Sequence, residues 1–170
     1  MKTILLIISY FRQCLLWFKV YLVSIKSNPS INWLCPTICE IPKEYPQNIK
    51  FLKTDLESLN SRVNELVDWE VPLTPLKFCD IKPAYTEIFE GYDFWEICDM
   101  DIIWGDIRKF ITPKLLESYD IISSRKEVIS GHFNLFRNTP LLSCLYLKTP
   151  NYKELFVSLK FQWKDEKSSI

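Results

Sequence analysis

Two carboxylates spaced two residues apart follow an apolar run in the stretch FWEICDMDIIWGDI, residues 94–107. A carboxylate that is buried without a partner costs several kcal/mol or gives up its charge, so Asp99 and Asp101 need a compensating role. Residues i and i+2 of an extended chain point to the same side. Two carboxylates on one side form a hard-oxygen site suited to Mg²⁺ or Mn²⁺, with open positions for phosphate oxygens. The pattern therefore predicts a divalent-cation site at these two acids.

A structural role is the alternative for the same acids. Both could cap the turn that leads into GDIRKF, or pair with Arg108 and Lys109. A D-x-D tripeptide at the end of an apolar strand favours neither interpretation, so both stay open at this point. Asp106, in the turn that follows, is interpreted as a turn residue.

The elements that must position these acids alternate along the first two-thirds of the chain. Strands are expected at 4–10, 31–37, 48–53 and around Ile97, and helices at 15–25, 54–67 and 82–92. The second helix has a capping-box signal at Thr54 and Glu57. Such alternation predicts an α/β fold with a largely parallel sheet and helices on both faces. Ligands bind at the carboxyl ends of the strands in these sheets, so the acids are expected at that edge and not in the core.

The N-terminal run MKTILLIISYFRQCLLWFKVYLVSI resembles a signal peptide or membrane anchor. Polar residues interrupt it, however, and leave no 18 consecutive apolar residues: Arg12, Gln13 and Lys19. Apolar residues at spacings of three and four indicate an amphipathic helix instead: Leu15, Phe18, Leu22 and Ile25. We expect a buried strand followed by this helix. Peripheral membrane association of the helix is an alternative that stays open.

Composition narrows the class of protein. A chain of 170 residues suits one domain. Its 21 basic and 21 acidic residues cancel, which gives no electrostatic signal for a nucleic-acid partner. Only 3 glycines occur, so glycine-rich phosphate loops are absent. Most of the 6 cysteines sit in apolar runs, and the pair Cys35 and Cys39 lacks a second pair of ligands for zinc. We therefore expect a cytoplasmic protein in a reducing compartment, with the inner membrane surface as its alternative location.

Three successive blocks of the chain carry a resemblance: KFCDIKPAYTEIF, GYDFWEICDMDIIWGDIRKF and SGHFNLFRNT. Together with ILLIISYF and NPSINWL, they resemble microbial glycosyltransferase-like proteins with the GT-A fold and a D-x-D motif, over about residues 3–160. The resemblance implies Mn²⁺ or Mg²⁺ and a UDP- or GDP-sugar donor. It also implies transfer to a glycan or lipid-linked hydroxyl, as in polysaccharide biosynthesis.

The resemblance also assigns roles to residues of the first two blocks. Asp99 would face the ribose or sugar of the donor and share the metal with Asp101. Asp80 and Lys82 would contact the nucleotide or the donor sugar. A helix N-cap ahead of Pro83 is an alternative role for Asp80, and the two roles are compatible.

The third block adds three candidates. His132, the only histidine, would bind the metal or contact the acceptor or a phosphate. Arg137 and Asn138 would contact the acceptor or a phosphate. The alternatives are a plain structural role for the histidine and pairing of Arg137 with a surface carboxylate.

These observations predict a GT-A-like α/β domain with a mixed, mostly parallel sheet flanked by helices. One domain is expected over residues 1–170, with a C-terminal region shorter than that of the family it resembles and a polar tail at 164–170. The expected activity is metal-dependent glycosyl transfer. One alternative is a GT-A-like protein that binds the nucleotide sugar without turnover. The less favoured alternative is a phosphatase of the haloacid dehalogenase type, with Asp99 as nucleophile and Asp101 as acid/base.

Overall fold

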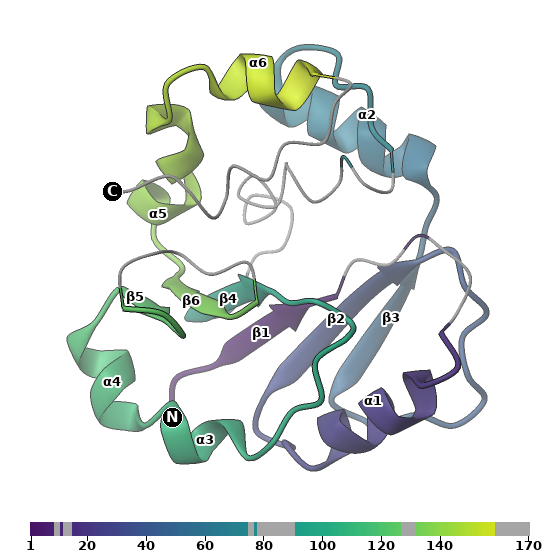
Figure 1. The fold of residues 1–170 in the computed structure, drawn as a ribbon, viewed down its shortest axis with the longest axis vertical. Helices are drawn as coiled ribbons and strands as arrows, with labels where there is room; N and C mark the ends of the chain where they lie inside the picture. Colours follow the sequence, from purple (N-terminus) through teal and green to yellow (C-terminus); the bar gives the residue numbers. More distant parts are fainter. Residues whose placement is uncertain (9–10, 12–14, 75–76, 78–90, 127–131, 159–170) are drawn as a thin grey trace.

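The computed structural model describes residues 1–8, 11, 15–74, 77, 91–126 and 132–158. Figure 1 shows a central sheet with helices on both sides. Its six strands lie in the order β3-β2-β1-β4-β6-β5. The strands are β1 Ile4–Ile7, β2 Asn32–Thr37, β3 Ile49–Lys53, β4 Phe94–Ile97, β5 Ile121–Ser123 and β6 Asn134–Arg137. The first four run parallel, and β6 is antiparallel to both β4 and β5. The predicted α/β class with a mixed sheet flanked by helices is confirmed.

The central strand β1 is buried along its whole length. It pairs in parallel with β2 on one side and with β4 on the other. Its side chains alternate between two hydrophobic clusters, with Ile4 and Leu6 in one and Leu5 and Ile7 in the other. A continuous apolar run without polar alternation is what a parallel strand covered on both faces requires.

Helices cover the two faces of the sheet in separate groups (Figure 1). One cluster packs against α1 Phe18–Lys26, α3 Ile107–Phe110 and α4 Pro113–Ser118. The other packs against α2 Leu56–Val67, the 3₁₀ helix η3 Leu145–Lys148 and α6 Tyr152–Val157, with α5 Pro140–Ser143 leading into η3. The connections through α1 and α2 run in opposite directions across the sheet. Crossovers of the same hand must then lie on opposite faces, as these two do.

Short polar side chains cap the starts of α2, α3, α4 and α5, whereas α1 and α6 have no side-chain cap. The side chain of Asp55 caps α2 by accepting a hydrogen bond from the Ser58 N–H at 2.7 Å. The predicted capping box at Thr54 and Glu57 is therefore wrong by one residue. Thr112 caps α4 by accepting from the Leu115 N–H, with a proline directly behind it.

The N-terminal segment forms a strand and then a helix, as expected. The strand ends at Ile7, earlier than the predicted residue 10, and residues 9–10 lie outside the described ranges. Within the described ranges, no helix has the length and apolar character needed to cross a membrane. The predicted helix at 82–92 and the tail at 164–170 fall almost entirely outside those ranges.

Candidate functional site

The carboxyl ends of β1 and β4 form the point where the chain changes direction across the sheet. From β1 the chain proceeds to β2 and β3, whereas β4 lies on the other side of β1. The Cys98 N–H donates to the Ile7 carbonyl at 2.9 Å, which holds the end of β4 against the end of β1. Asp99 follows directly. Open α/β sheets bind ligands in the crevice at such a topological switch point.

Asp99 and His132 meet at this edge. The Nδ1 atom of His132 lies 3.4 Å from Oδ2 of Asp99, and their side chains are 57% and 33% exposed. The histidine is brought there by β6, which begins at Asn134 and runs antiparallel to β4. Asp99 therefore lies partly exposed at the edge of the sheet and not in the core, as predicted, and its carboxylate is next to an imidazole.

Asp101 is exposed and lies in a turn that starts at Met100. The extended-chain argument, which places residues i and i+2 on one side, does not apply because the backbone turns between the two acids. Among the residues that the structure describes, no three His, Cys, Asp or Glu side chains form a metal-binding group. The geometry thus pairs Asp99 with His132, whereas Asp101 lies on the same loop and does not form a metal-binding group with them.

The loop that carries the acids is tied to α1. The Trp104 Nε1–H donates to the Tyr21 hydroxyl at 3.2 Å, and that hydroxyl also contacts Cys98 Sγ at 3.7 Å. Burial raises the pKa of Tyr21 well above its ordinary value, so the hydroxyl stays protonated. Trp104 also packs against Phe133, with ring centroids 5.7 Å apart. One buried tyrosine thus joins both ends of the segment that contains Asp99 and Asp101.

A second anchor fixes the end of this loop. Asn28, buried after α1, donates to the Gly105 carbonyl at 2.8 Å and accepts from the Ile107 N–H at 2.9 Å. Asp106 caps α3 by accepting from the Lys109 N–H at 3.3 Å. The interpretation of Asp106 as a turn residue agrees with this capping role.

The buried acid of the strand is Glu96, which the sequence analysis missed. It is 2% exposed, and its Oε1 accepts a hydrogen bond from the backbone N–H of Asn134 at 2.6 Å. The sequence did contain a signal for this buried position, because Glu96 is two residues from both Phe94 and Cys98 and therefore lies on the same side of the strand as they do. Glu96 holds the start of β6 against β4 and so helps to place His132.

The other candidates do not join this group. Asp80 and Lys82 lie outside the described residues. Arg137 lies opposite Phe94 in the strand register, at the other end of β4. Its Nε donates to Asp120 Oδ1 at 2.6 Å. This pairing with a surface carboxylate is the alternative given for Arg137. Asn138 donates to the Tyr92 carbonyl at 3.0 Å at that same end.

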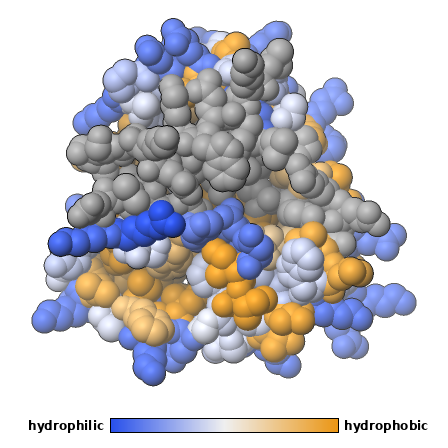
Figure 2. All heavy atoms as spheres, in the orientation of Figure 1, coloured by the Kyte–Doolittle hydropathy of each residue, from blue (hydrophilic) through white to orange (hydrophobic). Residues whose placement is uncertain are grey.

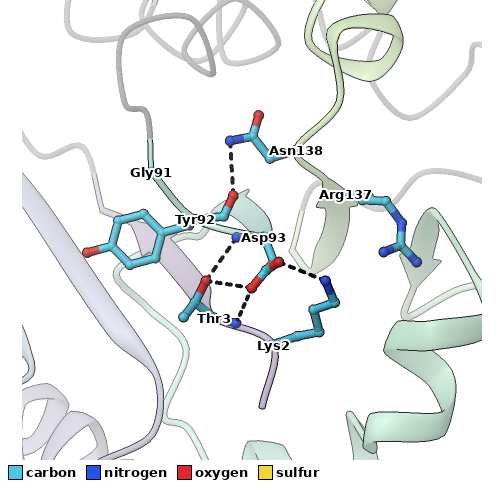
Figure 3. Close-up of a pocket in the computed structure, with 7 residues that line it drawn as sticks. All are labelled: Lys2, Thr3, Gly91, Tyr92, Asp93, Arg137 and Asn138. Carbon is cyan, nitrogen blue, oxygen red and sulfur yellow. Dashed lines mark hydrogen bonds and ion pairs between the residues drawn. The ribbon is translucent and has the colours of Figure 1, made fainter.

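A polar hollow of about 430 Å³ lies at this opposite edge (Figure 3). Its lining residues are Lys2, Thr3, Gly91, Tyr92, Asp93, Arg137 and Asn138. Asp93 accepts from the Thr3 N–H at 2.8 Å, the Thr3 hydroxyl at 2.9 Å and Lys2 Nζ at 2.9 Å. These hydrogen bonds, that of the Thr3 N–H first, lower the pKa of Asp93 to about 2. The cluster fastens the amino ends of β1 and β4 together.

Comparison with known proteins identifies a family for this chain. Residues 6–170 match a family of unknown function, DUF6625. No curated protein matches the chain, and no solved structure matches it either. Since the match covers nearly the whole chain, the protein belongs to the DUF6625 family.

Proposed function

We propose that this protein is a metal-dependent glycosyltransferase with a GT-A-like fold, which transfers a sugar from a UDP- or GDP-sugar to a glycan or lipid-linked hydroxyl. The observation that carries the proposal is the position of Asp99, which stands at the topological switch point with His132 at 3.4 Å. The resemblance of the blocks around these two residues to glycosyltransferase-like proteins supports the same function.

The side chains at this edge offer ligand atoms that suit a divalent cation bound to a diphosphate. A carboxylate oxygen from Asp99 and an imidazole nitrogen from His132 are ligands compatible with Mn²⁺, and Asp101 adds a second carboxylate on the adjoining turn. Asp99 and His132, which are in contact, would leave most coordination positions of the cation to water and to oxygens of the nucleotide sugar. A cation held there would neutralise charge on the departing nucleoside diphosphate.

The chain's own residues have two tasks in this proposal. Asp99, Asp101 and His132 would hold the cation, which would in turn bind the diphosphate of the sugar donor. The anchors from Tyr21 and Asn28 hold the loop of the acids in a fixed position, so that little ordering is needed when the donor binds.

Thermal denaturation with a panel of nucleotide sugars tests the proposal. A ligand that binds only the folded protein raises its melting temperature by mass action. We expect one donor class to raise it only when Mn²⁺ is present, and Asp99→Asn to abolish the shift. Glu117→Gln, which removes an exposed acid on α4, serves as the matched control and should keep the shift. Melting of each variant in metal-free buffer separates lost binding from lost folding. Full metal-dependent binding by a folded Asp99→Asn protein would contradict the proposal.

A turnover assay separates the alternatives. The transferase should release a nucleoside diphosphate from the donor that binds and should not hydrolyse an aryl phosphate. Donor binding without release would favour the binding-only alternative. A covalent aspartyl-phosphate at Asp99 would favour the phosphatase and overturn the transfer reaction.

A further inference from the structure

The outward side of α1 carries apolar side chains that are exposed and do not pack in the core. The inward side packs on the sheet through Phe18, Tyr21, Leu22 and Ile25. The outward side and the turn before it expose further apolar residues: Leu16 at 97%, Trp17 at 46%, Val20 at 55% and Val23 at 67%. Val20 and Val23 are three residues apart on α1 and so lie on one helix face, and Leu16 and Trp17 come directly before the helix. We call these four residues the α1 outer stripe.

The charged side chains of α1 itself are all positive. Lys19 and Lys26 are exposed and seven residues apart, which places both along one flank of the stripe. Residues 15–28 contain no acidic side chain. Figure 2 shows hydrophobic side chains reaching the surface in the region of the molecule where Figure 1 places α1. The helix thus presents an apolar stripe, a tryptophan and a cationic flank to solvent.

We infer that the α1 outer stripe docks on the surface of an anionic lipid bilayer. A helix with apolar residues on one side and lysines beside them lies in the boundary between headgroups and acyl chains. Tryptophan favours that boundary, and lysine stems can extend along it so that their ammonium groups meet anionic headgroups. A stable protein interface needs roughly 20–30 residues on each side, far more than this short stripe provides. A bilayer accepts a single narrow stripe because the apolar side chains only need to sink below the headgroups.

Docking through α1 would bring the candidate site close to the bilayer. The helix follows the carboxyl end of β1, so its N-terminal end, preceded by Trp17, lies toward the edge of the sheet where Asp99 is found. The inward side of α1 also holds the loop that carries Asp99 and Asp101, through the hydrogen bond from Trp104 to the Tyr21 hydroxyl. An acceptor hydroxyl on a lipid-linked molecule would then reach the site from the membrane surface. That choice of acceptor rests on the proposed function, whereas docking itself does not.

Vesicle sedimentation tests the docking without donor or metal. One set of vesicles is phosphatidylcholine alone, and the other contains roughly one-third phosphatidylserine. The full chain should sediment with the anionic vesicles and much less with the neutral ones. The triple variant Leu16→Ser, Val20→Ser, Val23→Ser should lower the bound fraction by about tenfold, because the apolar side chains that would enter the bilayer are lost. Lys19→Gln with Lys26→Gln should reduce binding to the level of neutral vesicles, and added salt should do the same.

Control variants carry the same change elsewhere. Leu141→Ser and Val157→Ser remove exposed apolar side chains on α5 and α6 and should leave vesicle binding unchanged. Circular dichroism confirms that each variant is folded, which is expected because all replaced side chains point to solvent. Absence of binding to anionic vesicles, or equal binding by the triple variant, would overturn the inference. So would a dimer that the triple variant converts to a monomer, since the stripe would then contact a second copy. None of these outcomes depends on donor binding.

Discussion

Nδ1 of His132 lies 3.4 Å from Oδ2 of Asp99, although the two residues belong to separate strand ends. The antiparallel pairing of β4 with β6 sets this contact. Trp95 opposes Phe136 and Phe94 opposes Arg137, so the chain before β6 arrives beside the chain after β4. The register of one strand pair therefore builds the centre of the candidate site.

His132→Gln tests whether the imidazole is a metal ligand. Because Asp99 and Asp101 would remain, we expect Mn²⁺-dependent nucleotide binding to weaken by about tenfold without being abolished. The measurement is a titration with Mn²⁺ at a fixed nucleotide concentration, in which the melting temperature is the readout. The metal-free melting temperature should hardly change, since the side chain is 57% exposed. An unchanged Mn²⁺ affinity would remove His132 from the ligand set.

Tyr21→Phe tests the anchor between α1 and the acid loop. The change deletes the hydroxyl that accepts from Trp104 Nε1 and keeps the ring in the core. We expect a loss of about 1 kcal/mol in the free energy of unfolding, together with weaker nucleotide binding, because the loop is less fixed. Urea denaturation and the nucleotide titration measure the two effects. The matched control, Tyr119→Phe, removes an exposed hydroxyl and should change neither.

The lowered pKa of Asp93 should make the stability of the fold depend on pH. Its pKa falls from 3.8 to about 2 in the folded protein, mainly through the Thr3 N–H and Lys2. The ionised group therefore stabilises the fold above about pH 4, and this contribution fades as the pH falls toward 2. Asp93→Asn should cost about 1 kcal/mol at pH 7, a modest value because the side chain is partly screened by solvent. Urea denaturation from pH 7 downward should show the two proteins converging, and a constant difference would contradict this account.

Arg137→Lys should destabilise the fold without affecting the donor site. The guanidinium binds Asp120, the Leu116 and Tyr119 carbonyls and the face of the Phe94 ring, a set that a single ammonium cannot replace. We expect a loss of about 1–3 kcal/mol in the free energy of unfolding. Metal-dependent nucleotide affinity of the folded protein should stay the same. A selective loss of nucleotide affinity would return Arg137 to the phosphate role inferred from its sequence block.

Much of the fold could be predicted because its strands are short apolar runs with strong neighbouring signals. The runs at Ile4–Ile7 and Asn32–Thr37 are buried on both faces, and the alternation of strands and helices indicates a parallel sheet. The sequence does not locate the cap of α2, since Thr54 and Asp55 are both good caps. Only the backbone geometry, with Ser58 donating to Asp55, distinguishes them.

The candidate site was only partly predictable. Position along the chain correctly placed Asp99 at the edge of the sheet. Spacing could not reveal that the backbone turns at Met100, and the shared block of His132 and Arg137 hid their separation to opposite ends of one strand. A four-residue strand is long enough to separate residues that are close in sequence. Which residues of β4 these two side chains face depends on strand register, which a single sequence does not encode locally.

Glu96 gives the last prediction, which tests how the start of β6 is held. Its Oε1 accepts the Asn134 N–H at 2.6 Å in a fully buried position, so Glu96→Ala should leave that donor without its acceptor. We expect a loss of about 1–3 kcal/mol in the free energy of unfolding and weaker Mn²⁺-dependent nucleotide binding, because His132 is no longer fixed beside Asp99. Glu96→Gln keeps an oxygen acceptor and should retain more of both properties. If Glu96→Ala lowered stability but left Mn²⁺ affinity intact, the carboxyl group would stabilise the sheet alone and the placement of His132 would not depend on it.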